Sequence, residues 1–315
     1  MTLRLGTRAS ALALAQSGHV AAEISARLGR DVELVEISTT GDRSNAPVAR
    51  LGVGVFVSAL RDALLAKEID LAVHSYKDLP TAAADGLAIP AIPARIDARD
   101  ALVATGGRIL AELQTGARVG TGAPRRAAQL LALGRGLEPV SVRGNVDTRL
   151  RKLANGEFDA VVLARAGLLR LGNAGVVTEI LDPLLMLPAP AQGALAIECR
   201  EDDADLREQL AALDHHATRA AVIAERALLA ALEAGCSAPV AALAEVAEGD
   251  VGPEIYLRGG VFSQDGSFVL RRSRTAPATE KTLQAVADQV GRELATDLLA
   301  EGAETVLGVH HDPQP

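Results

Sequence analysis

Residues 69–80 read Ile-Asp-Leu-Ala-Val-His-Ser-Tyr-Lys-Asp-Leu-Pro, and they join a short strand to a cluster of reactive side chains. The segment 69–74 is short and apolar, which is typical of a strand buried on both faces of a sheet. A helix is predicted just before it, over 53–66, after a Gly-rich stretch. Because strands and helices that alternate in this way build α/β proteins, this segment indicates the fold class.

The same alternation extends on both sides of residues 69–80. Ser10 is predicted to cap the first helix, which ends near residue 28. Pro90, Pro93 and the charged stretch 95–100 predict a boundary, and a second α/β unit follows it. The predicted strands of the two units are 3–7, 32–38, 69–74, 101–105, 117–121, 139–143, 158–164 and 194–199, and their helices are 11–28, 53–66, 124–133 and 146–155.

The pattern changes near residue 217, where a helix is followed by alternating strands and a last helix over 282–300. We therefore expect two doubly wound α/β lobes and a small C-terminal α+β domain. The strand at 194–199 is expected to return to the first lobe, so that the chain crosses twice between the lobes. The expected domains are 1–93 with 194–213, 98–190, and 216–315.

The composition is that of a globular protein: of 315 residues, 49% are apolar and 23% charged. A net charge of −8 and the absence of Trp argue against a nucleic-acid partner, because such proteins use basic grooves and stacked aromatic rings. No apolar stretch approaches the length of a membrane span, and the run 11–15 is too short for a signal peptide. Two cysteines without a CxxC or HExxH motif predict no metal site and a reducing, cytoplasmic setting.

Basic residues gather where predicted strands end and helices begin. Arg8 lies near Ser10 after the first strand, Arg125 and Arg126 follow a Gly-containing turn, and Arg143 and Arg149 belong to a third turn that contains Gly144. Free N–H groups and the positive end of the helix dipole make each such turn suited to an anion, and Arg adds a planar pair of donors. One turn alone is more often a solvated helix start. Three of them at the carboxyl ends of strands predict a cleft for a multiply anionic ligand.

The segment that follows the strand at 69–74 offers an imidazole, a hydroxyl, an ammonium and a carboxylate from His74, Ser75, Lys77 and Asp78. We expect these groups at the edge of the cleft. Asp78, just before Leu-Pro, has the position of a common turn residue. A carboxylate beside Lys77 and nearby arginines also stays ionised, and it then stabilises a cationic intermediate.

Cys236 lies in Gly235-Cys236-Ser237-Ala238-Pro239, where the helix that begins near residue 220 ends. A lone cysteine is usually a small buried apolar residue, and by itself this one would be interpreted so. Its position on a loop at a helix exit also suits a reactive sulfur. Cys199, within a predicted strand, is interpreted as a core residue.

Taken together and in order, these segments resemble the porphobilinogen deaminase family of tetrapyrrole biosynthesis. The resemblance extends from residue 4 to about 275, and only the collinear set is specific. Its carriers are Gly6-Thr7-Arg8-Ala9-Ser10, Gly54-Val55-Phe56-Val57, Ala72 to Thr81, Arg99-Asp100-Ala101, Arg125-Arg126, Arg143-Gly144-Asn145, Leu163 to Leu168, Pro190 to Ala194 and Gly235-Cys236.

The resemblance implies a monomeric, cytoplasmic transferase whose two lobes are similar to those of periplasmic binding proteins. It implies a dipyrromethane cofactor attached to Cys236 through a thioether, and four porphobilinogen units added head to tail, each losing ammonia. Asp78 is the implied catalytic residue. The implied cofactor-binding residues are Cys236, Ser10, Lys77, Asp78, Arg125, Arg126 and Gly144, and the implied substrate-binding residues are Arg8, Arg143, Arg149, Ser75 and Gln192.

The chain departs from the family pattern at three places. Val53 stands where the family often has Lys, Gly122-Ala123 replaces a common Ser-Ser, and Arg165 replaces an apolar residue and has no assigned role. Two other interpretations of the residues remain open. One is a two-lobed binding protein for an anionic small molecule, and the other is a cysteine hydrolase with His74, His215 or His216 as its base.

Overall fold

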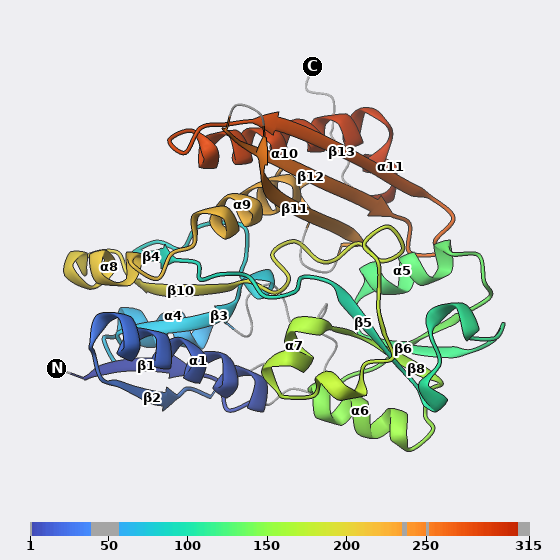
Figure 1. Ribbon diagram of the computed structural model, residues 1–315, viewed down its shortest axis with the longest axis horizontal. Coiled ribbons are helices and arrows are strands. Elements are labelled where there is room, and N and C mark those ends of the chain that lie inside the picture. The colour runs from blue at the N-terminus through green and yellow to red at the C-terminus, as the bar shows by residue number, and fades with distance from the viewer. Residues whose placement is uncertain (1, 39–56, 235–237, 250–251, 308–315) are drawn as a thin grey trace.

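The computed structural model describes residues 2–38, 57–234, 238–249 and 252–307, and its strands form three sheets (Figure 1). Cys236 and the segment around Val53 lie outside the described residues. The first lobe (blue to cyan) and the second (green) lie side by side below the third region (orange and red). Among the described helices, none combines the length and the apolar character that crossing a membrane requires.

The first sheet has the strand order β2-β1-β3-β10-β4. Its parallel strands are β1 (Leu3–Thr7), β2 (Val32–Glu36) and β3 (Leu71–Ser75). The strand β10 (Leu195–Arg200) runs antiparallel between β3 and the edge strand β4 (Leu87–Ala91). The chain therefore returns to this sheet more than a hundred residues after leaving it.

The second sheet has the matching order β7-β6-β8-β5-β9. Here β6 (Arg118–Thr121), β7 (Glu138–Ser141) and β8 (Ala160–Ala164) are parallel. The strand β5 (Asp100–Ala104) runs antiparallel between β8 and β9 (Glu179–Ile180). In each sheet the antiparallel inner strand is the first strand after the chain has crossed from the other lobe. We call residues 92–99 the first crossover and residues 181–194 the second crossover.

Helices cover the two sheets (Figure 1). Apolar side chains fill the space between the helices and the sheets. Leu5, Leu71 and Ile197 in the first lobe and Leu102 and Val119 in the second are fully buried. The helices of the lobes are α1 (Ala11–Leu28), α4 (Ser58–Leu65), α5 (Pro124–Ala132), α6 (Val146–Ala154), α7 (Arg165–Arg170) and α8 (Ala204–Ala211), and the short 3₁₀ turns are η1 (Tyr76–Asp78), η2 (Thr105–Gly107), η3 (Leu110–Glu112) and η4 (Ala174–Val176).

The third region is an antiparallel sheet of β11 (Val240–Gly249), β12 (Gly252–Phe262) and β13 (Val269–Pro277). Two long helices, α9 (His216–Ala231) and α10 (Leu283–Ala300), pack on it, and the short α11 (Ala303–Leu307) follows. The two long helices cross closely at Gly291, where an added Cβ would lie 2.4 Å from the carbonyl oxygen of Ala224. In Figure 1, α9 is the helix of this region nearest the first lobe.

The sheets confirm the predicted fold class of two α/β lobes and a small α+β region. Pro90 was interpreted as part of a boundary, and this is wrong, because it lies inside β4. Proline is tolerated there because β4 is an edge strand. The short helices α7 and α8 were not predicted. The helix predicted over 53–66 is observed from Ser58, and its first predicted residues lie outside the described ranges.

Candidate active site

The loop after β3 carries three of the predicted site residues. Ser75 ends the strand, and its hydroxyl accepts a hydrogen bond from Nε2 of Gln16 on α1 at 2.8 Å. Lys77 and Asp78 follow on η1, where Lys77 is half-buried and Asp78 is exposed. Among the described residues, none makes a hydrogen bond to the Asp78 carboxylate.

Gln192, on the second crossover, connects this loop to the other lobe. Its Oε1 accepts a hydrogen bond from Nζ of Lys77 at 3.3 Å. Its Nε2 donates to Oδ1 of Asp100 at 2.7 Å and to the carbonyl of Ala98 at 2.8 Å. A continuous polar contact therefore joins the first lobe, both crossovers and the first residue of β5.

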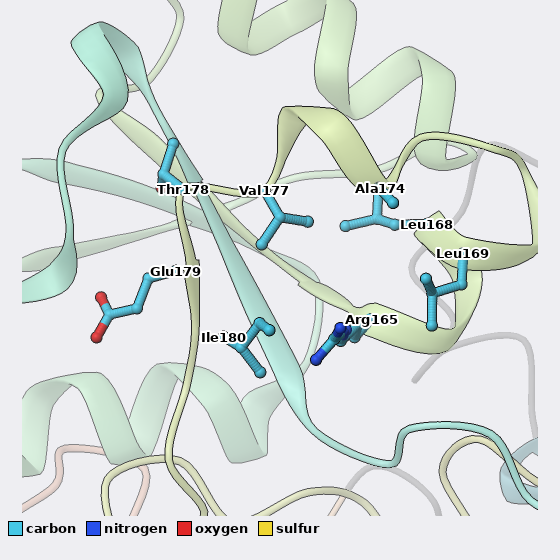
Figure 2. A pocket seen from close by; sticks show the side chains of 8 residues that line it. All are labelled: Arg165, Leu168, Leu169, Ala174, Val177, Thr178, Glu179 and Ile180. Atoms are coloured by element: carbon cyan, nitrogen blue, oxygen red, sulfur yellow. The ribbon is translucent and has the colours of Figure 1, made fainter.

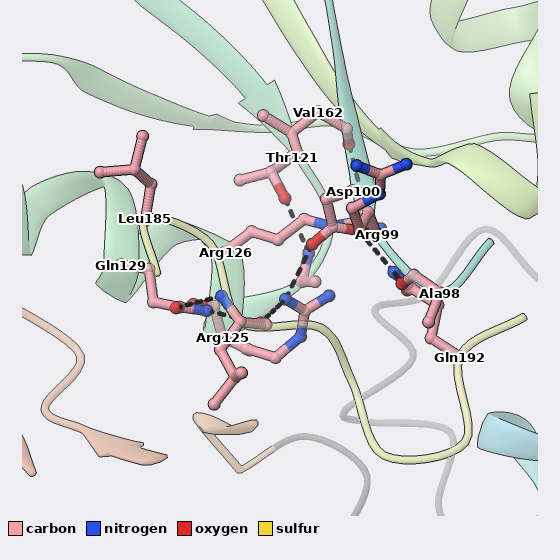
Figure 3. A network of polar contacts seen from close by, with 12 residues as sticks. Ala98, Arg99, Asp100, Thr121, Arg125, Arg126, Gln129, Val162, Leu185 and Gln192 are labelled. Carbon is pink, nitrogen blue, oxygen red and sulfur yellow. Dashed lines mark hydrogen bonds and ion pairs between the residues drawn. The ribbon is translucent and has the colours of Figure 1, made fainter. Parts of the chain in front are cut away.

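Asp100 is fully buried, and it holds both Arg125 and Arg126 (Figure 3). Each guanidinium donates to one carboxylate oxygen at 2.8 Å. Burial alone would raise the pKa of Asp100, but the charges and hydrogen bonds of the two arginines outweigh it and hold that pKa well below its usual range. The alternative that these arginines form a solvated helix start is wrong, because their exposed fractions are 4% and 5%.

The triad of Asp100 with Arg125 and Arg126 keeps one positive charge in excess. Nε of Arg126 is buried and has no hydrogen-bond partner among the described residues. An unsatisfied N–H in such a place costs free energy unless a ligand accepts its hydrogen bond. This donor suits a carboxylate.

Arg149 and Arg143 extend the positive surface beyond the triad. Desolvation first, and then the charges of Arg126 and Arg143, lower the pKa of Arg149 to about 10. Its guanidinium lies against Gly122, where an added Cβ would be 3.3 Å from Nη2. Gly144 has a φ of 102°, a backbone conformation that favours glycine, and it precedes α6. Arg149 Nε donates to its carbonyl at 2.8 Å.

The ammonium of Lys77 is also perturbed. Desolvation is the largest cause and lowers its pKa, Asp78 raises it, and Arg126 lowers it further, with a result of about 8. Cations that lower one another's pKa lie close together, so Lys77, Arg126 and Arg149 share one region across the two lobes. An anionic ligand there would relieve their mutual repulsion.

At the first of the three Arg-bearing turns, the predicted helix cap is present. The hydroxyl of Ser10 accepts a hydrogen bond from the backbone N–H of Ala13 at 3.3 Å, so Ser10 is the N-cap of α1. Its hydroxyl proton can still be donated to an anion. Arg8 is half-buried just before it.

His74 was expected at the edge of the cleft, and this is wrong. It is 5% exposed, and its Nε2 lies 3.1 Å from Oε2 of Glu198, which also holds Arg61. Successive residues of a strand face opposite sides, so His74 points away from the side that Ser75 faces. Cys199 is fully buried in the first-lobe core, as predicted, and desolvation raises the pKa of its thiol to about 11.

Arg165, which had no role from sequence, holds the first crossover. Its Nη1 donates to Oδ2 of Asp97 at 2.6 Å, and Asp97 also binds Arg99. Arg165 also lines a cavity of about 260 Å³ with mostly apolar walls (Figure 2). That cavity shares no lining residue with the predicted site, and Glu179 stands on its other side.

Sequence reasoning missed three residues that organise the site. Asp100 supplies the negative charge for the arginine pair, Gln16 holds Ser75, and Arg170 donates to the carbonyl of Gly193 at 2.8 Å. A signal existed for Asp100, because an acidic residue at the start of an apolar strand is rarely buried without a partner. Gln16 and Arg170 lie in helices, and nothing in the sequence around them indicated a role in the site.

Comparisons with known proteins cover nearly the whole chain. The family model described as "Porphobilinogen deaminase, dipyromethane cofactor binding domain" matches residues 3–208, and "Porphobilinogen deaminase, C-terminal domain" matches residues 219–300. The chain is 57% identical to "Porphobilinogen deaminase" of Nocardia farcinica, over 97% of this chain and 88% of that protein. It is 55% identical to the protein of that name from Mycobacterium tuberculosis, over 98% and 100%.

Among solved structures, the methionine-binding protein MetQ matches with a TM-score of 0.42 and 16% identity, over 67% of this chain and 89% of that one. A periplasmic substrate-binding protein from Coxiella burnetii matches with the same TM-score and 17% identity, over 67% and 91%.

Proposed function

This chain belongs to the porphobilinogen deaminase family, and from that membership we propose the roles of its own residues in joining porphobilinogen units into hydroxymethylbilane. The reaction joins four units head to tail and releases ammonia at each addition. The observation that carries the proposal is the exposed Asp78 carboxylate next to Lys77, whose ammonium in turn lies near Arg126 of the second lobe.

Asp78 is proposed as the catalytic residue. Loss of ammonia from porphobilinogen leaves a cation on the substrate, and a fixed carboxylate stabilises developing positive charge. The Asp78 oxygens also suit a hydrogen bond from the pyrrole N–H.

Each pyrrole carries an acetate and a propionate, so the growing chain is a polyanion. Arg8, Arg143 and Arg149 are proposed to bind its carboxylates, with Ser75 and Gln192 as polar neighbours. The lowered pKa of Arg149 supports this, because it results from desolvation first and then from the neighbouring charges of Arg126 and Arg143.

The residues present fit the dipyrromethane cofactor of the family. The unpaired Nε of Arg126 is a feature that a polycarboxylate would satisfy. We propose that Ser10, Lys77, Asp78, Arg125, Arg126 and Gly144 hold it and that Cys236, outside the described residues, anchors it through sulfur. When bound, the cofactor supplies the primer to which substrate units are added.

The domain division 1–93 with 194–213, 98–190 and 216–315 is likewise proposed. It is supported by the membership of β10 in the first sheet and of β5 in the second. We also propose a monomer, as the resemblance implies. The scarcity of cysteine supports a cytoplasmic location, and the net charge of −8 supports the absence of a nucleic-acid partner.

Two measurements test the proposal together. Wild-type protein incubated with porphobilinogen should release ammonia and form a uroporphyrin precursor, and its intact mass should exceed that of the bare chain by one dipyrromethane. The Cys236→Ser variant should have the bare mass and no turnover. Cys199→Ala, which changes only the buried thiol, should keep both properties. An active enzyme with the bare mass would refute the anchor, and binding without ammonia release would favour a binding protein.

A further inference from the structure

Arg226, on α9, reaches out of the third region to the loop that carries Asp78. Its Nη1 donates to the carbonyl oxygens of Tyr76 at 3.3 Å and Leu79 at 3.0 Å, and its Nη2 donates to that of Pro80. The guanidinium carbon lies 4.3 Å from the centre of the Tyr76 ring. One side chain therefore binds the backbone on both sides of Asp78 and stacks on the residue two before it.

The helix that carries Arg226 is itself held firmly against both crossovers. Glu225, the preceding residue, is fully buried and accepts hydrogen bonds from Arg95 at 2.6 Å and from the backbone N–H of Ala191. Val222, one helical turn earlier, packs in the same apolar cluster as Tyr76. Arg226 therefore connects α9, which is held by these buried contacts, to the short turn η1.

The turn is three residues long, and its closing hydrogen bond runs from the N–H of Leu79 to the carbonyl of Tyr76 at 3.2 Å. Its two ends are anchored, because Tyr76 and Leu79 are buried and the N–H of Tyr76 donates to the carbonyl of Ala194 at 3.1 Å, whereas Asp78 between them is exposed. Because no described residue bonds the Asp78 carboxylate, the location of that carboxylate depends on the backbone of the turn. A displacement of about 1 Å in a catalytic group can lower a rate about a hundredfold.

We propose that Arg226 is a positioning residue for Asp78, holding the carboxylate in place through the carbonyls of residues 76, 79 and 80. The proposal rests on the function proposed above. It assigns the C-terminal region a second task besides carrying Cys236, which is to set the geometry of the reacting loop in the first lobe.

Arg226→Met tests this, because it keeps the length of the side chain and removes its donors. Arg219→Met is the matched control: Arg219 also lies on α9 and binds first-lobe carbonyls, those of Ile89 and Pro90, but away from Asp78. We expect kcat of Arg226→Met to fall about tenfold or more with KM for porphobilinogen within about threefold, since a misplaced catalytic group loses mainly transition-state stabilisation. Arg219→Met should keep kcat within about twofold.

Hydrogen exchange tests the same inference without requiring catalytic turnover. Hydrogen exchange of the segment 76–80, including the Leu79 N–H, should accelerate in Arg226→Met and stay unchanged in Arg219→Met. Arg226→Lys, which keeps the charge but reaches fewer carbonyls, should have an intermediate kcat. If Arg226→Met does not fold, Arg226→Lys decides by the same two readouts.

The inference would be overturned if Arg226→Met had the kcat of the wild type, or if Arg219→Met lost as much kcat as Arg226→Met. The proposed function would still stand in either case, provided that the wild type is active. A bare intact mass in Arg226→Met would also overturn it, since the loss would then lie in cofactor attachment. A wild type that releases no ammonia would overturn both.

Discussion

Asp78 is exposed and lies next to the ammonium of Lys77, and its charge is the property that the proposed chemistry needs. Asp78→Asn keeps the shape and removes the charge. We expect kcat to fall about a hundredfold or more, because a preorganised charge of this kind contributes about 3 kcal/mol to transition-state stabilisation. Steady-state ammonia release measures the effect. Asp85→Asn, at an exposed aspartate on the next turn, is the control, and near-normal kcat in Asp78→Asn would remove Asp78 from its role.

Lys77 has a pKa of about 8, lowered chiefly by desolvation. In protein without the cofactor, its ammonium therefore loses its proton as pH rises through about 8, and its reactivity towards an amine reagent should rise over the same range. A bound polycarboxylate favours the ammonium, so cofactor attachment should move the midpoint to higher pH. Peptide mass spectrometry after labelling at a series of pH values checks this.

The other lysines, Lys67, Lys152 and Lys281, serve as internal controls for the same labelling experiment. A Lys77 midpoint above 10 without the cofactor would contradict the burial inferred for its ammonium.

The start of β5 and the first turn of α5 meet through Asp100. Asp100→Asn would leave Arg125 and Arg126 buried without a counter-charge, which costs about 3–5 kcal/mol of stability. Removing one partner of the exposed Arg292–Asp288 pair by Asp288→Asn should cost less than about 1 kcal/mol. Urea denaturation near pH 7 compares the two variants.

The difference in the free energy of unfolding between wild type and Asp100→Asn should depend on pH. A carboxyl whose folded-state pKa is depressed contributes stability above its unfolded pKa of about 3.9 and loses it as pH falls towards the folded value. The difference should therefore be full near pH 7 and shrink below about pH 4. A difference that stays constant down to pH 3 would mean that packing, and not charge, is what Asp100 contributes.

Elements with a strong local pattern were predicted well from sequence. The strand 3–7 and the helix capped by Ser10 agree with the structure at both ends. Elements with a weak or misleading pattern were not predicted. Pro90 suggested a break, but it continues β4, because an edge strand does not need a backbone N–H donor at that position. The helix α7 is only six residues long, which is too short for a clear helical pattern.

At the scale of the whole molecule, one buried carboxylate on α9 contacts both crossovers and the C-terminal sheet. Glu225 accepts hydrogen bonds from Arg95 of the first crossover, from Ala191 of the second and from the Ala244 N–H of β11. Glu225→Gln removes the charge and turns an N–H₂ group towards these donors. We expect a loss of about 3–5 kcal/mol and a thermal midpoint lower by roughly 5–10 °C.

Calorimetry and limited proteolysis of residues 92–99 measure the effect of Glu225→Gln. Glu301→Gln, at the exposed pair with Arg272, is the control and should change the midpoint little. Cleavage of the crossover at the wild-type rate in Glu225→Gln would show that Glu225 does not hold the parts together.

Local pattern sufficed for the α/β alternation, the Arg-bearing helix starts and the placement of Lys77 and Asp78 after a buried strand, since each depends on neighbours in the chain. Long-range packing alone made the contacts of Asp100 with its two arginines, the burial of His74 and the contact of Arg226 with Tyr76, which is 150 residues away. Spacing in the sequence does not encode which surfaces meet when three sheets assemble, because those contacts form between side chains whose separation in the chain carries no periodic signal.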